Sequence, residues 1–132
     1  MNAHLPTLGL PLQGLPVLDP ACIREMGEEL DHPSALTFLS AYLDFLPERL
    51  ATLCAAVALE DGEAAMDRVL SLKVSSTMVG ARRLSALAEA LQGLVCTGNW
   101  AAAEPLLKVL DASVAAVLAA GRAAVVSSDS QG

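Results

Sequence analysis

Most of the residue types that supply catalytic and metal-binding groups are scarce in this chain of 132 residues. It has two histidines, three cysteines and four aromatic residues (Phe 2, Tyr 1, Trp 1). The cysteines, Cys22, Cys54 and Cys96, are odd in number and form no CxxC unit, so the sequence predicts neither a disulfide framework nor a zinc site. We expect reduced thiols, no metal and no other cofactor.

Basic residues and long apolar runs are also scarce. Eight Lys and Arg stand against 15 Asp and Glu, and the resulting net charge of −7 disfavours a nucleic-acid partner. The longest apolar run lies between Asp111 and Arg122 and is shorter than the roughly 20 residues that span a membrane. Residues 1–18 lack a basic region and are interrupted by prolines, unlike a secretory signal. We therefore expect a cytoplasmic protein.

Alanine and leucine are abundant instead, with 24 of each, and both favour helix. Asp19-Pro20 opens a predicted short helix, because Asp is a good N-cap and Pro suits the first helical position. Four longer helices follow, in which apolar residues recur every three or four positions. The breaks between them fall at Asp31-His32-Pro33-Ser34, Asp61-Gly62, Gly80 and Gly98-Asn99, and the last helix is predicted to end near Val125.

Short links between long helices predict antiparallel neighbours. The expected fold class is all-α, an up-and-down antiparallel four-helix bundle with a short additional N-terminal helix. This bundle is assigned to residues 18–126. The Pro- and Gly-rich segment 1–17 and the small, polar segment 127–132 are expected to be flexible ends.

The predicted third helix carries an unusual pattern of small hydroxylated residues between leucines, Arg68-Val-Leu-Ser-Leu-Lys-Val-Ser-Ser-Thr-Met-Val-Gly-Ala81. Their hydroxyls can bond back to the preceding turn, and their size lets a neighbouring helix approach closely. The run resembles the signature of histidine-containing phosphotransfer (HPt) domains, His-x-Leu-Lys-Gly-Ser-Ser followed by Gly-Ala. The matching residues are Leu72, Lys73, Ser75, Ser76, Gly80 and Ala81.

Two positions depart from that signature, and they decide the functional prediction. Leu70 stands where the family has its phosphoacceptor histidine, and Val74 stands where it has glycine. Phosphorelay needs a nucleophilic imidazole, which leucine does not provide. The resemblance therefore implies a degenerate, pseudo-phosphotransfer HPt domain of two-component signal transduction. Such a domain is not an enzyme and binds partners without accepting phosphate.

The partner implied by the resemblance is a response-regulator receiver domain or a sensor histidine kinase. On a helix, Met66, Leu70, Val74 and Thr77 lie on nearly one side, and we expect this side to form an apolar docking surface. Residues 63–85 carry a net charge of 4 − 2 = +2, which suits the acidic pocket of a receiver. The other predicted partner-binding residues are Phe45, Arg68, Lys73, Arg82 and Arg83.

Three alternatives stay open at this stage. The Leu70 side could join two copies of the chain in a homodimeric structural scaffold, or the N-terminal leucines could cover it. The chain could also be a working phosphorelay protein with a non-standard acceptor, for which the histidines His4 and His32 are the candidates.

Overall fold

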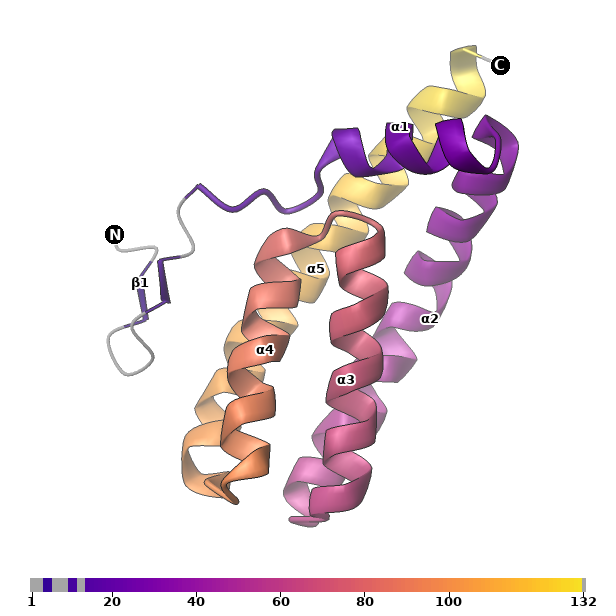
Figure 1. Cartoon of the computed structure of the whole chain (residues 1–132). Coiled ribbons are helices and arrows are strands. Elements are labelled where there is room, and N and C mark those ends of the chain that lie inside the picture. Colours follow the sequence, from indigo (N-terminus) through magenta and orange to yellow (C-terminus); the bar gives the residue numbers. More distant parts are fainter. Residues whose placement is uncertain (1–3, 6–9, 12–13, 132) are drawn as a thin grey trace.

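Four long helices lie side by side as a bundle, and a shorter helix crosses one end of it (Figure 1). This computed structural model describes residues 4–5, 10–11 and 14–131. The short helix is α1 (Pro20–Glu29), and the bundle consists of α2 (His32–Ala58), α3 (Gly62–Met78), α4 (Arg82–Cys96) and α5 (Trp100–Gln131). The predicted all-α fold class and its up-and-down bundle are confirmed.

The structure differs from the predicted elements at both ends. A short antiparallel pair, β1 (His4–Leu5) with β2 (Leu10–Pro11), lies in the N-terminal segment, where two-residue strands leave no periodic pattern to detect. The rest of the predicted flexible segment up to residue 13 lies outside the described residues. At the other end, α5 continues past its predicted end near Val125 to Gln131, because the polar residues after Val125 contain no helix breaker before Gly132.

Asx side chains cap the N-termini of four helices. Asp19, Asp31 and Asp61 accept hydrogen bonds from backbone N–H groups in the first turns of α1, α2 and α3, at 3.0, 2.7 and 3.1 Å. Asn99 accepts one from the first turn of α5 at 3.3 Å. Each cap satisfies an N–H group that has no partner within the helix, so the breaks that the sequence predicted also define where the helices begin.

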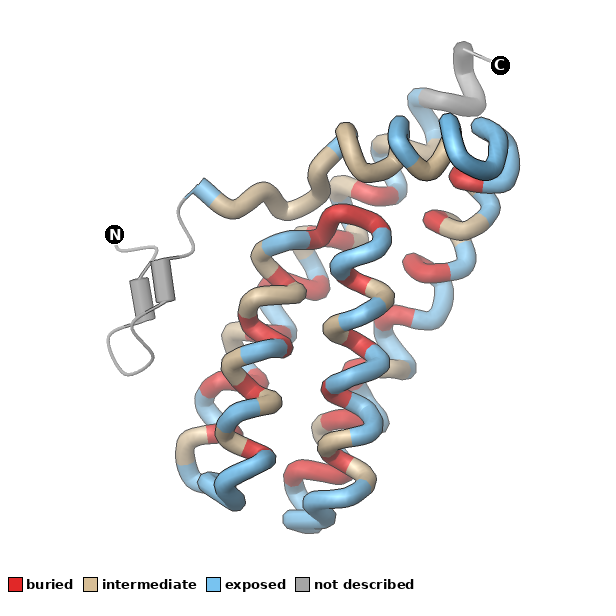
Figure 2. The backbone as a smooth tube through the Cα atoms, viewed as in Figure 1, coloured by how far each residue is buried: buried red, intermediate tan, exposed pale blue. Residues whose placement is uncertain are grey.

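The core lies between the helices of the bundle, where buried residues occupy the inward faces (Figure 2). The α2–α5 interface is close at Gly121, because a Cβ atom there would lie only 2.5 Å from Leu43 Cδ2. The largest fully buried side chains are Leu39, Leu43, Leu46, Leu53, Leu72, Leu84, Leu87, Leu91 and Leu110, together with Val57, Val69 and Val79.

Helix α5 is the one described helix that is long and apolar enough, over Trp100–Ser127, to cross a membrane by length and composition. Core helices of soluble proteins pass the same test. Here Leu106, Leu110 and Val114 of α5 are buried in the bundle core. The sequence prediction of no spanning segment rested on uninterrupted apolar runs, whereas α5 meets the length and composition requirement when its few charged residues are included.

Candidate functional site on helices α2 and α3

Large apolar side chains are exposed together on one side of the bundle. Leu70, Val74 and Met78 follow one another at intervals of four residues along α3 and are 38%, 58% and 49% exposed. Phe45, on α2, is 53% exposed. These four residues, here called the apolar stripe, are four of the seven large hydrophobic residues exposed in the described part of the chain. Their clustering distinguishes them from single exposed leucines, which are ordinary.

Two hydrogen bonds between α2 and α3 fix the position of Phe45 relative to the α3 residues. The Tyr42 and Ser76 hydroxyl oxygens lie 2.8 Å apart in the buried interface, and Arg49 donates from Nη1 to Ser71 Oγ at 2.6 Å. Because α2 and α3 run side by side in opposite directions (Figure 1), Phe45, between Tyr42 and Arg49, lies level with the α3 segment between Ser71 and Ser76. The stripe therefore spans two helices, as the sequence predicted when it added Phe45 to the Leu70 side.

Burial strongly affects the Tyr42–Ser76 pair. Desolvation of the phenol raises the pKa of Tyr42 to about 12, although the hydrogen bond with Ser76 and the Arg49 charge act in the opposite direction. Tyr42 is accordingly neutral at physiological pH and serves as a hydrogen-bonding group in the core.

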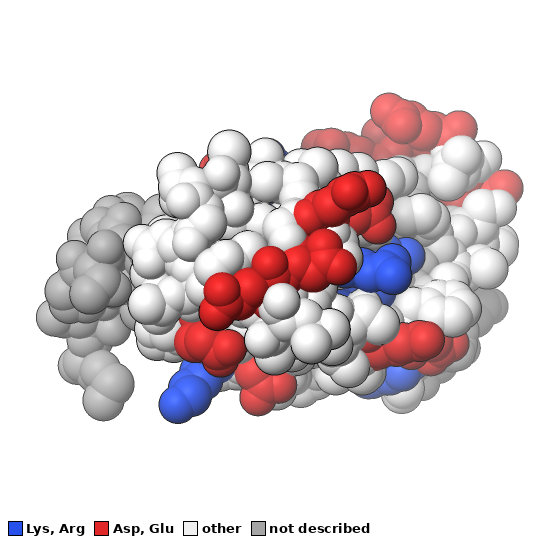
Figure 3. All heavy atoms as spheres, turned by 90° about the horizontal axis from the view of Figure 1, so that it is seen from below, with Lys and Arg blue, Asp and Glu red and all other residues white. Residues whose placement is uncertain are grey.

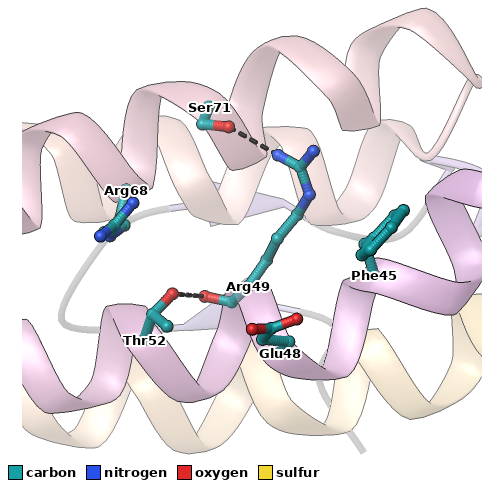
Figure 4. Close-up of a pocket in the computed structure, with 6 residues that line it drawn as sticks. All are labelled: Phe45, Glu48, Arg49, Thr52, Arg68 and Ser71. Atoms are coloured by element: carbon teal, nitrogen blue, oxygen red, sulfur yellow. Dashed lines mark hydrogen bonds between the residues drawn. The ribbon is translucent and has the colours of Figure 1, made fainter.

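A hollow of about 410 Å³ lies beside the stripe, between α2 and α3 (Figure 4). Arg49 extends from α2 across this hollow toward Ser71, and Arg68 lies along α3 on the same side. The lining residues, here called the arginine groove, are Phe45, Glu48, Arg49, Thr52, Arg68 and Ser71. The groove thus joins two guanidinium groups and two hydroxyls to the apolar stripe, with which it shares Phe45.

The other hydroxyls of α3 are engaged within the bundle. Ser75 Oγ donates to the carbonyl of Ser71 at 2.8 Å, which is the back-bonding that the sequence predicted. Thr77 Oγ1 lies 2.8 Å from the carbonyl oxygen of Lys73 and 2.6 Å from Ser85 Oγ on α4. Thr77 is exposed at the edge of the stripe, while Ser76 is fully buried.

Lys73 turns toward α4. Its Nζ donates to Gln92 Oε1 at 3.1 Å and lies 3.6 Å from Glu89 Oε1. This ammonium group is therefore partly neutralised on the α4 side of the stripe. Met66, another predicted docking residue, is half-buried and packs against the core, so it adds less exposed apolar surface than the residues of the stripe do.

The two predicted arginines of α4 hold the N-terminal segment. Arg82 Nε donates to Asp19 Oδ2 at 3.0 Å, and Arg83 donates from Nε and Nη2 to the carbonyl of Leu15 at 3.2 and 3.1 Å. The backbone N–H of Ala21 and then the Arg82 guanidinium lower the pKa of Asp19. Both arginines therefore bind residues of the chain that precede α1.

Without Arg82 and Arg83, the third helix is not basic. Residues 62–78 contain two basic and two acidic residues, a net charge of 2 − 2 = 0. The positive charge beside the stripe comes from Arg68, which the sequence predicted, and from Arg49 on α2, which it did not. Met78 was also missed, although its spacing of four from Val74 could have identified it.

Of the two alternative acceptors, His32 is not brought to this site. His32 is exposed at the start of α2, and α1 crosses the bundle at that end (Figure 1). His4 lies outside the residues whose side chains the structure describes. Among the N-terminal leucines that the sequence offered as a cover for the stripe, Leu5, Leu8, Leu10 and Leu12 also lie outside those residues, whereas the carbonyl of Leu15 accepts hydrogen bonds from Arg83 of α4.

Comparisons with known proteins agree with the signature in α3. The Hpt domain family model matches residues 37–120, which include α3, α4 and most of α2 and α5. A crystal structure of histidine-containing phosphotransfer protein B (HptB) from Pseudomonas aeruginosa PAO1 superposes with a TM-score of 0.77 at 23% identity. That match covers 83% of this chain and 95% of the other. No curated protein sequence matches the chain. Since the family model spans well over half of its residues, the chain belongs to the Hpt domain family.

Proposed function

We propose that this Hpt-family chain is a pseudo-phosphotransfer module that docks a response-regulator receiver domain through the apolar stripe and accepts no phosphate from it. Members of this family are two-component phosphotransfer modules that interact with receiver domains and kinases. The observation that carries the proposal is the exposure of Leu70 and Val74 on α3, at the positions of the signature's histidine and glycine.

The first part of the proposal rests on the chemistry around Leu70. A leucine side chain cannot form a phosphoramidate, and its neighbours are poor substitutes. The Ser71 hydroxyl accepts the Arg49 hydrogen bond, and a serine phosphate ester would not readily return its phosphoryl group to an aspartate. Lys73 is an ammonium group held by Gln92 and Glu89. We therefore expect no acceptor on this face.

The second part rests on the match between this face and a receiver. The phosphorylation pocket of a receiver is rich in carboxylates, so an apolar centre with arginines on one side complements it. Acidic side chains gather at the end of the bundle where α2 meets α3 (Figure 3), and the exposed Glu60, Asp61 and Glu63 lie there. This charge disfavours docking through that end. A receiver partner also places the module in the cytoplasm.

Binding to purified receiver domains from the source organism tests the docking surface. Leu70→Asp should weaken the affinity at least tenfold, because it buries a carboxylate against an acidic partner, and tenfold corresponds to about 1.4 kcal/mol. Leu59→Asp is the matched control, since Leu59 is 79% exposed and lies outside the stripe. The control should bind within twofold of wild type. Equal losses in both variants, or no binding to any receiver, would overturn the docking proposal.

A phosphotransfer assay tests the missing acceptor separately. Wild-type protein incubated with a radiolabelled phosphoreceiver should remain unlabelled while a working HPt domain becomes labelled. The double variant Leu70→His/Val74→Gly restores the signature and should acquire acid-labile, base-stable label. Label of that kind on the wild type would show a working relay protein, with His32 and His4 as the sites to map.

The homodimeric scaffold is the second candidate, because the same exposed stripe could be covered by another copy. Sedimentation equilibrium of the wild type distinguishes it. A dimer that Leu70→Asp, but not Leu59→Asp, converts to a monomer favours the scaffold, and a monomeric wild type excludes it.

A further inference from the structure

The guanidinium group of Arg49 is held in place without being neutralised. Its Nη1 donates to Ser71 Oγ at 2.6 Å, which fixes it across the arginine groove. The four ion pairs among the described residues do not include Arg49. Arg68 is paired only with its sequence neighbour Asp67, at 3.6 Å and with both side chains more than half exposed. Such an exposed pair contributes little and is readily exchanged for another anion.

Counting donors shows what the groove can bind. An arginine has five N–H donors, and the structure assigns one from Arg49, to Ser71. Since Ser71 Oγ accepts that bond, its own proton is available to donate. Thr52 Oγ1 already donates to the Arg49 carbonyl at 3.1 Å. The groove therefore presents N–H and O–H donors from Arg49, Arg68 and Ser71 around one hollow.

The charge of the lining favours a compact dianion. Two guanidinium groups stand against the single carboxylate of Glu48, so the lining has a net charge of 2 − 1 = +1. Arginine binds phosphoryl groups with parallel N–H···O bonds, and the planar fork of Arg49 is already oriented by Ser71. A phosphoryl group offers three oxygens to these donors, whereas a carboxylate offers two.

From this arrangement we infer that the arginine groove is a binding site for a phosphoryl dianion. The inference rests on the proposed function for the source of that group, the phosphorylated aspartate of the docked receiver. Ser71 follows Leu70 in the chain, so the groove lies directly beside the stripe on which the receiver docks. The contact is non-covalent, and the acyl phosphate stays on the receiver. The module therefore selects phosphorylated receivers and reads their state without discharging it.

The groove can be tested without a receiver by following NMR signals of the full chain during titration with inorganic phosphate and, separately, acetyl phosphate. The Arg49 Nε–H and Ser71 amide signals should shift in a saturable way. Arg49→Gln should weaken binding at least tenfold, and Arg49→Lys should lie between it and wild type, because lysine keeps the charge without the fork. Arg122→Gln is the control, since Arg122 is exposed and bonded to Asp44 at 3.0 Å. It should bind phosphate as wild type does.

Two results of this titration would overturn the site. One is the absence of saturable shifts at the groove with either phosphate compound. The other is an equal loss of affinity in Arg49→Gln and Arg122→Gln, which would indicate general charge attraction. Thermal melting of Arg49→Lys verifies that the bundle is folded, so a loss in that variant reports on the groove.

Affinities for receivers with and without beryllofluoride, which imitates the phosphoaspartate, test the source of the group. Wild type should prefer the beryllofluoride form at least tenfold, and Arg49→Gln should lose that preference, because its affinity for the beryllofluoride form falls further than its affinity for the unmodified receiver. Equal affinity of wild type for both forms overturns the inference and leaves the docking proposal intact. Phosphate binding at Arg49 without binding to any receiver overturns the receiver as the source and the docking proposal with it.

Discussion

Replacing Tyr42 by phenylalanine should lower the free energy of unfolding by about 1–3 kcal/mol. Tyr42 is 6% exposed and Ser76 is fully buried, and their hydroxyl oxygens are 2.8 Å apart. Phenylalanine preserves the packing of the ring but removes the partner that the structure gives the Ser76 hydroxyl. A buried polar group left without a hydrogen bond costs about 1–3 kcal/mol, more than the bond itself contributes.

A double-mutant cycle separates that cost from other effects of the substitutions. Ser76→Ala leaves the Tyr42 hydroxyl without its partner, whereas Tyr42→Phe/Ser76→Ala removes both polar groups. The double variant should therefore be more stable than the sum of the single losses predicts, by about 1 kcal/mol or more. Urea unfolding followed by circular dichroism at pH 7 measures all three variants. Additive losses, or a loss below about 0.5 kcal/mol in Tyr42→Phe, would refute the buried pair.

The same tyrosine predicts a loss of stability at alkaline pH. Burial raises the pKa of Tyr42 to about 12 in the folded protein, whereas an unperturbed tyrosine, as in the unfolded chain, has a pKa of 10.0. The neutral form is favoured in the fold, so this contribution is complete below pH 10 and is lost as pH rises through 12. The difference between the two pKa values corresponds to at most about 3 kcal/mol of stability. Tyr42→Phe should lack this loss in urea unfolding between pH 9 and 12.

Four further variants test local geometry. Gly80→Ala should cost roughly 1–3 kcal/mol in thermal unfolding, because Gly80 has φ of +81° and the added Cβ would lie 2.9 Å from the Asp19 carbonyl oxygen. A hydrogen bond accepted from the backbone N–H of Ala21 lowers the pKa of Asp19 below 3.8, so protection of α1 amides against hydrogen exchange, relative to the unfolded chain, should decrease as pH falls below 3.8, and Asp19→Asn should abolish that dependence. Gly93→Ala should stabilise the fold by about 0.5–1 kcal/mol, since no atom lies within 4 Å of the added Cβ and alanine favours helix. Gly121→Ala should destabilise the fold by about 1–3 kcal/mol, because its Cβ would clash with Leu43. The melting temperatures of these two variants should therefore move in opposite directions.

The sequence predicted well the features that depend on residues close together in the chain. Helix starts at Asp19, Asp31 and Asp61 follow from local capping, and the exposure of Leu70 and Val74 follows from position on one helix together with the family signature. These predictions need only the helical period and the hydrogen bonds of a first turn. Neither requires knowledge of which helices are neighbours.

The features that sequence reasoning missed depend on contacts between distant residues. Arg82 and Arg83 looked available because their partners, Asp19 and the Leu15 carbonyl, are more than sixty residues away in the chain. Arg49 was overlooked because its role depends on the register of α2 against α3, which periodicity does not determine. The charge of the segment therefore predicted basic residues beside the stripe and identified Arg68 on α3, but it missed the contribution of Arg49 on α2.

The structure separates the frame of the site from its reactive centre. The Tyr42–Ser76 pair joins α2 to α3, and Lys73 reaches α4, on the same helix that carries Leu70 at the acceptor position of the signature. If only the fold were needed, a polar residue at this exposed position would cost nothing, because surface positions tolerate substitution. Apolar residues at both Leu70 and Val74, with Phe45 and Met78 beside them, instead create a patch whose exposure favours binding to another surface. The helix pair that would orient an acceptor thus presents the apolar stripe, which we propose as the docking surface. Arg49, which takes part in none of the ion pairs among the described residues, lies at its edge.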